Sequence, residues 1–334
     1  MTAAAQAAQP APTDPRAAFA RVLRRNTWTA GLVVLLVVML AITRMLAPEY
    51  GAAQIESLAI SAMPVALAAV AQAIVVIAGG IDLSVGSMMA FTSVTAAVLM
   101  QGQSDAFAVG VVVGVLAMGI VLGFINGALV VTTRVPDIVV TLAMSFVWAG
   151  AALLVLDTPG GAAAAWLTAA IDGTLISEWI PRALVLLIFV VAVVWIPVLR
   201  SGLGISLYAV GSDRLAAFRS GVPVGRTKVL AYVLTGLFSA AGGLVLTMST
   251  GIGSPVPGPY TLQSVAAIVL GGVSLAGGRG GLLGPILAVF ILTLVRTDLT
   301  FLGVNPNLST AIQGAILVGV VMFGAVLTFR RKRR

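Results

Sequence analysis

The chain has 334 residues, of which 60% are hydrophobic and only 9% are charged, and its mean hydropathy is +1.11. These values lie far outside the range of soluble domains and predict a membrane protein. The sequence contains no cysteine and no histidine. Disulfide bonds, thiol nucleophiles, zinc sites and imidazole acid–base chemistry are therefore excluded.

Apolar runs near the length of a membrane span recur from Trp28 to the last turn before Arg330. A helix needs about 20 such residues to cross a hydrocarbon core about 30 Å thick. The sequence therefore predicts an all-α polytopic membrane protein with about ten transmembrane helices. The expected spans are 28–46, 58–78, 83–100, 108–131, 138–156, 183–199, 229–249, 261–276, 282–296 and 309–328.

Two short tails flank this transmembrane domain, which we place at residues 28–329. Residues 1–27 are rich in alanine and proline and predict a disordered N-terminal tail, and residues 330–334 form a basic C-terminal tail. A cleaved signal peptide is the rival interpretation of the first span, with "EYGAAQ" as the cleavage region. We favour an uncleaved helix.

Basic residues divide unevenly between the two sides of the membrane. If the N-terminus is cytoplasmic, only Arg44, Arg182 and Arg296 lie outside, and 16 of the 19 basic residues lie inside. Positive loops resist translocation, so this asymmetry predicts that both termini are cytoplasmic. Topology and anionic lipid then explain the net charge of +8, and nucleic acid is not an expected partner.

The longest inside loop spans residues 200–228 and reads "RSGLGISLYAVGSDRLAAFRSGVPVGRTK". Ser212 is expected to cap a short helix over "DRLAAFRS", Gly221 suits the left-handed position after its end, and Pro223 prevents its continuation. The loop is therefore predicted to hold a short helix at the membrane surface.

The side chains of this short helix suggest two roles. Leu215 and Phe218 are expected to share one face, while Arg214 and Arg219 reach away from it. The helix either rests on lipid headgroups or docks a cytoplasmic partner protein. The charge pattern alone leaves both interpretations open.

Two glycine-rich stretches resemble each other, namely "VVIAGGIDLS" at 75–84 and "AIVLGGVSLA" at 267–276. Both are expected to interrupt their helices, because adjacent glycines loosen a helix, and to lie in protein-lined or wet surroundings. Repeats with interrupted helices are a common plan for substrate paths. Chance similarity is the alternative explanation in a chain with 37 glycines.

Asp82 follows the first glycine pair. Asp82 and Ser84 are expected to cap a helix that begins near Leu83, because their oxygens accept its free amide groups. The functional alternative is that Asp82 borders a translocation path, since an acidic side chain at membrane depth requires water or a partner. The candidate path or helix-break residues are Gly79, Gly80, Asp82, Ser84, Gly86, Asn126, Gly271, Gly272 and Ser274.

A tight cytoplasmic helical hairpin is predicted by "NGALVVTTRVPDIVVTL", which begins at Asn126. Pro136 is expected to open the second helix, and Asp137 to interact with the dipole at its N-terminus.

Motifs of catalysis and of other transport classes are missing from the sequence. "GVPVGRTK" at 221–228 lacks the spacing of a phosphate-binding loop, and no strand precedes it. The spans carry neither the regular arginines of a voltage sensor nor a potassium-channel filter. The small number of buried charges argues against a proton-coupled pump.

Four stretches, in order, carry a family resemblance: "GGIDLSVGS" (79–87), "NGALVVTTRVPDIVVTLAM" (126–144), "YAVGSDRLAAFRSGV" (208–222) and "IVLGGVSLAGGRGGLLG" (268–284). They resemble the membrane-spanning permease subunits of bacterial ABC importers for monosaccharides, of which the ribose permease is the familiar member. The resemblance covers roughly residues 30–328.

The resemblance implies the ABC importer permease fold in the bacterial inner membrane. It also implies pairing with a second copy as a homodimer, a cytoplasmic ABC ATPase as partner, and a periplasmic sugar-binding protein that delivers the solute. The chain itself is expected to be a transport subunit and not an enzyme. No cofactor is expected in it, because the partner ATPase binds ATP and magnesium.

The loop at 200–228 matches the coupling segment of this family, which rests in a cleft of the ATPase. The resemblance therefore favours docking over contact with lipid. The matching positions are Asp213, Arg214, Phe218, Arg219 and Gly221, and Ser212 and Leu215 complete the candidate coupling residues.

The glycine-rich segments 79–87 and 271–280 match those that shape the path between the two subunits of such importers. Asp137 and Ala143 depart from the family pattern, which has an apolar residue and a glycine at these positions. These departures concern the packing of the fifth span.

The expected function is ATP-driven import of a monosaccharide through alternating access of a permease dimer. The alternative keeps this architecture and changes the cargo to a nucleoside, polyol, signalling furanose or branched-chain amino acid. A stand-alone channel or a membrane enzyme is the remote alternative, since it would need a filter or catalytic cluster that the sequence lacks.

Overall fold

The computed structural model describes residues 27–305, 307–309, 311–316, 318–319 and 322. The expected tails and much of the last expected span, 309–328, lie outside these residues. The described chain is built from helices: α2 (Thr27–Leu46), α3 (Ala52–Ile77), α4 (Val85–Met100), α5 (Asp105–Thr133), α6 (Asp137–Val155), α7 (Ala165–Ala169), α8 (Arg182–Arg200), α9 (Gly202–Ser212), α10 (Arg214–Arg219), α11 (Val224–Thr250), α12 (Tyr260–Leu270) and α13 (Leu283–Phe301).

Within the described residues, seven helices are long and apolar enough to cross a membrane: α2, α3, α5, α6, α8, α11 and α13. Three further apolar helices are shorter, with 16 residues in α4 and 11 each in α9 and α12. The prediction of an all-α polytopic protein is confirmed, but about ten full spans are not. The expected span 261–276 is too long, because α12 ends at the glycine pair inside that apolar run.

The core is centred on α3. In its apolar window 83% of the residues are buried, compared with 61% in α11, 17% in α8 and 11% in α2. α5 crosses α11 closely, since a Cβ on Gly127 would lie only 2.9 Å from the Cα of Val229. Small residues permit such contacts between membrane helices. The outer helices leave many large apolar side chains exposed, as expected where helices face lipid.

The hairpin that follows Asn126 is confirmed. α5 ends at Thr133, Arg134 adopts the left-handed conformation with a φ of 60°, and α6 begins at Asp137. Pro136 is the N-cap residue of α6. Proline suits this position because it has no backbone N–H to leave unpaired.

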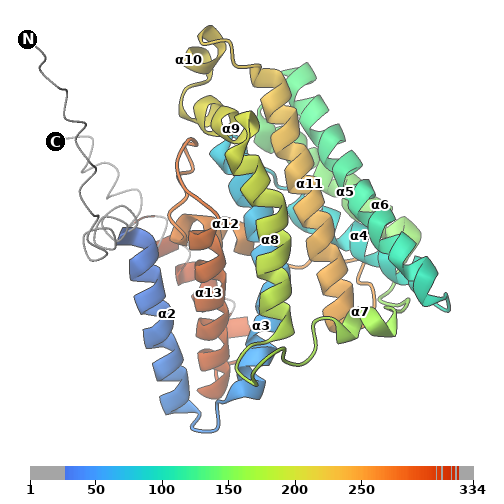
Figure 1. The fold of residues 1–334 in the computed structure, drawn as a ribbon, viewed down its shortest axis with the longest axis vertical. Helices are drawn as coiled ribbons and strands as arrows, with labels where there is room; N and C mark the ends of the chain where they lie inside the picture. Colours follow the sequence, from blue (N-terminus) through green and yellow to red (C-terminus); the bar gives the residue numbers. More distant parts are fainter. Residues whose placement is uncertain (1–26, 306, 310, 317, 320–321, 323–334) are drawn as a thin grey trace, which may run out of the picture.

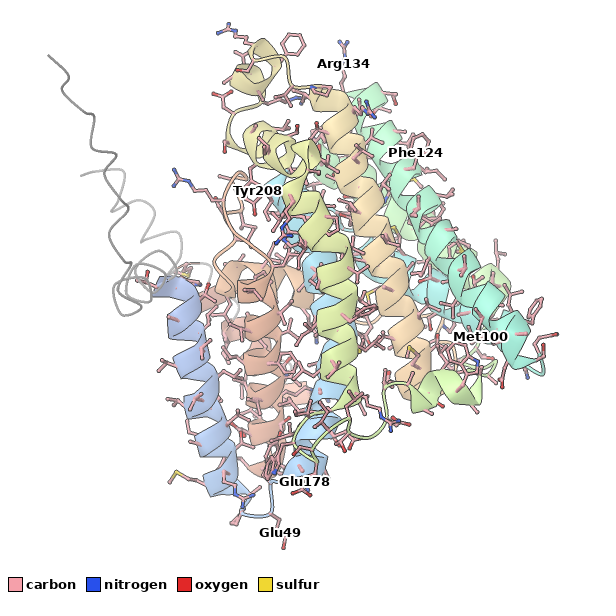
Figure 2. The ribbon with its side chains drawn as sticks, viewed as in Figure 1. Glu49, Met100, Phe124, Arg134, Glu178 and Tyr208 are labelled. Carbon is pink, nitrogen blue, oxygen red and sulfur yellow. The ribbon has the colours of Figure 1, made fainter. Side chains whose placement is uncertain are left out.

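The bundle has two ends, which we name after the helices that mark them. α10 lies beyond the bundle at one end, and α7 lies at the other (Figure 1). Arg134 lies at the α10 end, whereas Glu49 and Glu178 lie at the α7 end (Figure 2).

Candidate coupling site and helix breaks

The short helix expected in the loop at 200–228 is confirmed as α10, and a further helix, α9, precedes it. The N-cap of α10 is Asp213, whose Oδ1 accepts hydrogen bonds from the backbone N–H groups of Leu215 and Ala216, both at 2.9 Å. The prediction that Ser212 is the cap is wrong, because Ser212 is the last residue of α9.

The outer face of α10 combines apolar and basic side chains. Leu215 is 57% exposed and Phe218 is 68% exposed, so they share an outer face as expected. Arg219 is also exposed. A shallow groove of about 470 Å³ is lined by Arg214, Leu215, Phe218, Val224 and Gly225.

The inner face of α10 is anchored to its neighbours. Ala217 is buried and packs with Val210 of α9 and Val224 of α11. The end of the helix follows the prediction, since Gly221 adopts the left-handed conformation with a φ of 82° and Pro223 becomes the N-cap residue of α11. The inner face of α10 is therefore packed against α9 and α11, whereas no described residue covers its outer face.

The first glycine pair ends α3. Gly79 is left-handed, with a φ of 75°, and its N–H donates to the carbonyl of Val76 at 2.9 Å. The N–H of Gly80 donates to the carbonyl of Val75, also at 2.9 Å. Together these bonds form a Schellman motif, which satisfies carbonyl groups that a helix end leaves unpaired.

The second glycine pair ends α12 in the same way. Gly272 is left-handed, with a φ of 82°, and its N–H donates to the carbonyl of Val269 at 3.0 Å. The N–H of Val273 donates to the carbonyl of Ile268 at 2.9 Å. Both glycine-rich stretches therefore interrupt their helices, as predicted.

The two helix ends correspond with an offset of one residue. The sequence similarity pairs Gly79 with Gly271, but the left-handed position that matches Gly79 is Gly272. Gly271 instead faces the start of α13, where a Cβ on it would lie 2.6 Å from the Cα of Pro285. Ser274 follows in the connecting loop, and its N–H donates to the carbonyl of Arg279 at 3.1 Å.

Asp82 is fully buried between α3 and α4. Its Oδ1 accepts hydrogen bonds from the backbone N–H of Ser84 at 2.8 Å and from the hydroxyl of Ser84 at 2.6 Å. Its Oδ2 has no hydrogen-bond partner among the described residues. The prediction that Ser84 caps α4 with its side chain is wrong, because that hydroxyl is directed to Asp82 and makes no bond to the helix.

Asn126 extends this polar cluster to two more helices. Its Nδ2 donates to the Ser84 hydroxyl oxygen at 2.7 Å, and its Oδ1 accepts from the Trp148 indole N–H at 3.2 Å. Trp148 stacks on Phe91, with ring centroids 6.3 Å apart. Asn126 lies inside the continuous α5, so it is not a helix break. A role in lining a path stays a prediction for all of these residues.

Two threonines that sequence reasoning missed accept hydrogen bonds from backbone N–H groups at the N-terminus of α4. The Oγ1 of Thr261, from α12, accepts the N–H of Gly86 at 2.9 Å, and a Cβ on Gly86 would lie 2.8 Å from this oxygen. The Oγ1 of Thr141, from α6, accepts the N–H of Leu83 at 3.1 Å. The amide groups of the break are thus satisfied by side chains distant in sequence.

Asp137 does more than face the N-terminus of α6. Its Oδ1 lies 2.7 Å from the Nζ of Lys228, on α11, in an ion pair. The Tyr232 hydroxyl lies 2.9 Å from Asp137 Oδ2 and 3.2 Å from the carbonyl oxygen of Ile81. A Cβ on Gly80 would lie 2.7 Å from Asp137 Oδ2. The departure from the family pattern therefore ties α6 and α11 to the break after α3.

Comparison with known proteins identifies the family of this chain. The family described as "Branched-chain amino acid transport system / permease component" matches residues 54–321. The probable ABC transporter permease protein y4mJ of Sinorhizobium fredii is 33% identical over 88% of this chain and 87% of its own length. The autoinducer 2 import system permease protein LsrD is 28% identical in Photorhabdus temperata, over 93% of this chain and 95% of the relative, and 29% identical in Yersinia enterocolitica, over 90% and 92%.

No solved structure matches the chain. The family match nevertheless covers the loop at 200–228, both helix breaks and the polar cluster between them, and the relatives are transport components and not enzymes. The resemblance to ABC permeases is thereby confirmed. The chain belongs to the family of branched-chain amino acid transport system permease components, and it is a multi-pass membrane permease of the ABC transporter class.

Proposed function

We propose that this permease imports a small polyhydroxylated solute, a monosaccharide or a furanose of similar size, by alternating access of a permease dimer. The observation that carries the proposal is the free outer face of α10, with Leu215 and Phe218 exposed beside Arg214. An apolar pair beside a guanidinium is typical of a surface that docks another protein. Here the partner is the ABC ATPase, which binds ATP and magnesium.

The α10 end faces the cytoplasm in this proposal, and both termini lie there. Support comes from the ten lysine and arginine residues in the described chain. Only Arg44, Arg182 and Arg296 lie near the α7 end. The other seven, which positive-inside topology would keep in the cytoplasm, are Arg134, Arg200, Arg214, Arg219, Arg226, Lys228 and Arg279.

Single cysteines test this orientation, because the chain has no cysteine of its own. Glu178→Cys should react with a membrane-impermeant maleimide in intact spheroplasts, whereas Arg134→Cys should react only after the membrane is permeabilised. The opposite labelling pattern would place α10 outside, where no ATPase is available, and would refute the proposal.

Exposed side chains at the α7 end support the proposal that a periplasmic solute receptor docks there. Residues 173–182 form a hairpin there, closed by a 3.1 Å hydrogen bond from the N–H of Leu175 to the carbonyl of Ile180. Its tip exposes Leu175, Ile176 and Trp179 by 57%, 84% and 53%. Glu178 lies within the hairpin, and the carboxylate of Glu56 accepts a hydrogen bond from the N–H of Gly173 at its base. Neither carboxylate forms an ion pair within the described residues. A receptor with a basic rim would complement this face.

The cargo is proposed from the relatives. The LsrD proteins are named for import of autoinducer 2, and they align over nine-tenths of this chain. The family description names branched-chain amino acids instead. A zwitterionic amino acid needs partners for both of its charges. Asp82 Oδ2 is a buried carboxylate oxygen without a partner, but Lys228, the one buried basic side chain among the described residues, is already paired with Asp137. The carboxylate of an amino acid therefore finds no free buried cation there. This favours an uncharged, hydroxyl-rich solute.

Reconstitution tests the function directly. The permease, its partner ATPase and its solute receptor are placed in liposomes, and uptake of labelled ribose, autoinducer 2 and leucine is compared with and without ATP. ATP-dependent uptake of a hydroxylated solute is the expected result. Uptake of leucine alone would move the cargo to amino acids, and flux through the permease without ATPase would indicate a channel.

A further inference from the structure

Three glycines from three separate segments meet directly below α10. Gly79 ends α3, Gly211 lies in the last turn of α9, and Gly277 lies in the loop between α12 and α13. A Cβ on Gly79 would lie 3.4 Å from the Cα of Gly211, and a Cβ on Gly277 would lie 3.0 Å from the Cα of Gly79 and 2.6 Å from the carbonyl oxygen of Gly211. We call this contact the glycine junction.

Hydrogen bonds hold the same three segments together. The N–H of Gly278 donates to the carbonyl of Ile77 at 2.9 Å, so the loop after α12 also satisfies the end of α3. The hydroxyl of Tyr208, one turn before Gly211, donates to the carbonyl of Gly280 at 2.8 Å. A Cβ on Gly211 would overlap the carbonyl oxygen of Ile77 and lie 2.7 Å from the N–H nitrogen of Gly278.

The junction lies two residues before the N-cap of α10 in sequence. α9 ends at Ser212, and Asp213 begins the next helix, so no flexible linker separates Gly211 from the outer face of α10. α9 also buries Gly204, Leu207 and Val210 against the bundle. α9 and α10 are therefore expected to move together when α10 is displaced.

We infer that Gly211 is a positioning residue of the transport cycle, through which a movement of α10 is passed to the helix breaks after α3 and α12 at once. This inference rests on the proposed function. At the glycine junction backbone lies on backbone, and no long side chain is present to absorb a shift by changing rotamer. Packed contacts of this kind transmit displacement because protein interiors resist compression.

The glycine junction also joins the two helix breaks to each other. Gly79 is itself the left-handed residue of the first Schellman motif, and Gly277 follows the second one within the same loop. A shift of Gly211 therefore acts on the C-terminal ends of α3 and α12 together. Opening of one break without the other is disfavoured.

Gly211→Ala tests the inference, with Gly202→Ala as its matched control. Both glycines belong to α9, and a Cβ on Gly202 meets nothing within 4 Å. In proteoliposomes with the ATPase and the receptor, Gly211→Ala should lower solute uptake per ATP hydrolysed by about tenfold, with the ATPase still bound, whereas Gly202→Ala should match the wild type.

Tyr208→Phe provides a milder second variant, should Gly211→Ala fail to assemble. It keeps the ring and removes the bond to Gly280, and we expect uptake per ATP to fall by about threefold. Wild-type coupling in Tyr208→Phe, or in an assembled Gly211→Ala, would overturn the inference. So would losses of ATP hydrolysis and uptake in equal proportion. If the wild-type complex shows no ATP-dependent uptake, it is the proposed function that fails.

Discussion

Lys228 Nζ lies 2.7 Å from Asp137 Oδ1, and this is the one ion pair within the described part of the chain. The two side chains are only 10% and 15% exposed, and they join α11 to the first turn of α6. Through Tyr232 the pair also reaches the carbonyl of Ile81, in the break after α3. A charged contact between two helices thus supports an irregular segment that lipid cannot solvate.

Removing one partner of this pair should destabilise the protein strongly. Asp137→Asn leaves Lys228 buried without a carboxylate, and we expect a loss of about 3 kcal/mol, seen as a lower Tm in detergent. The double variant Asp137→Asn with Lys228→Met should recover part of this loss, because no uncompensated charge remains. Arg226→Met, which removes an exposed charge near the start of the same helix, serves as the control. A Tm for Asp137→Asn equal to that of the control would show that the ion pair does not contribute to stability.

Phe218→Glu should separate ATP hydrolysis from transport. Phe218 is 68% exposed and lines the groove on α10, so a charge there opposes an apolar contact without disturbing the fold. We expect the variant to insert normally and to lose uptake by about tenfold or more. Ala216→Glu places the same charge at an exposed position of α10 outside the groove, and it should lose less. Equal losses in both variants, measured as uptake with receptor and ATP present, would contradict docking through this groove.

Hydropathy predicted the outer helices well. The expected spans 28–46 and 183–199 correspond to α2 and α8 within one residue at each end. These helices are mostly exposed in the described chain, so few packing contacts compete with the length of the apolar run in setting where they begin and end. The glycine-rich segments were located correctly for a related reason, since a left-handed helix end strongly favours glycine.

Sequence reasoning failed where several residues were equally suited to one role and contacts distant in sequence decided which of them is used. Ser212 and Asp213 are both good cap residues, and Asp213 is used because α9 continues through Ser212. The local sequence does not distinguish Thr261 and Thr141 from other threonines, and only the packing of α12 and α6 against the break gives them their amide partners. The meeting of Gly211 with Gly79 was invisible because it depends on the path of three separate segments.

Asp82→Asn should retain both assembly and uptake, within about twofold of the wild type. Oδ1 of Asp82 serves as an acceptor for two groups of Ser84, and asparagine keeps one oxygen acceptor at that site. Asp82→Leu removes the acceptor altogether and should cost about 2 kcal/mol, because the buried N–H of Ser84 loses its partner. Thermal stability and uptake are measured on the same preparations. A stable Asp82→Asn protein without uptake would show that the negative charge itself is needed.

The sequence predicts Ser212 as the cap of α10, whereas the structure has Asp213, and mutation of each residue distinguishes the two. Asp213→Ala removes the acceptor of two backbone N–H groups, which typically costs about 1 kcal/mol and should fray a helix of six residues. Because the groove is built on that helix, binding of the ATPase should weaken by about fivefold, whereas Ser212→Ala should leave it unchanged. Asp213→Asn, which preserves an oxygen at the cap, should restore binding. Titration of the ATPase onto the permease in nanodiscs measures all three, and a stronger effect of Ser212→Ala than of Asp213→Ala would mean that α10 starts at a different residue.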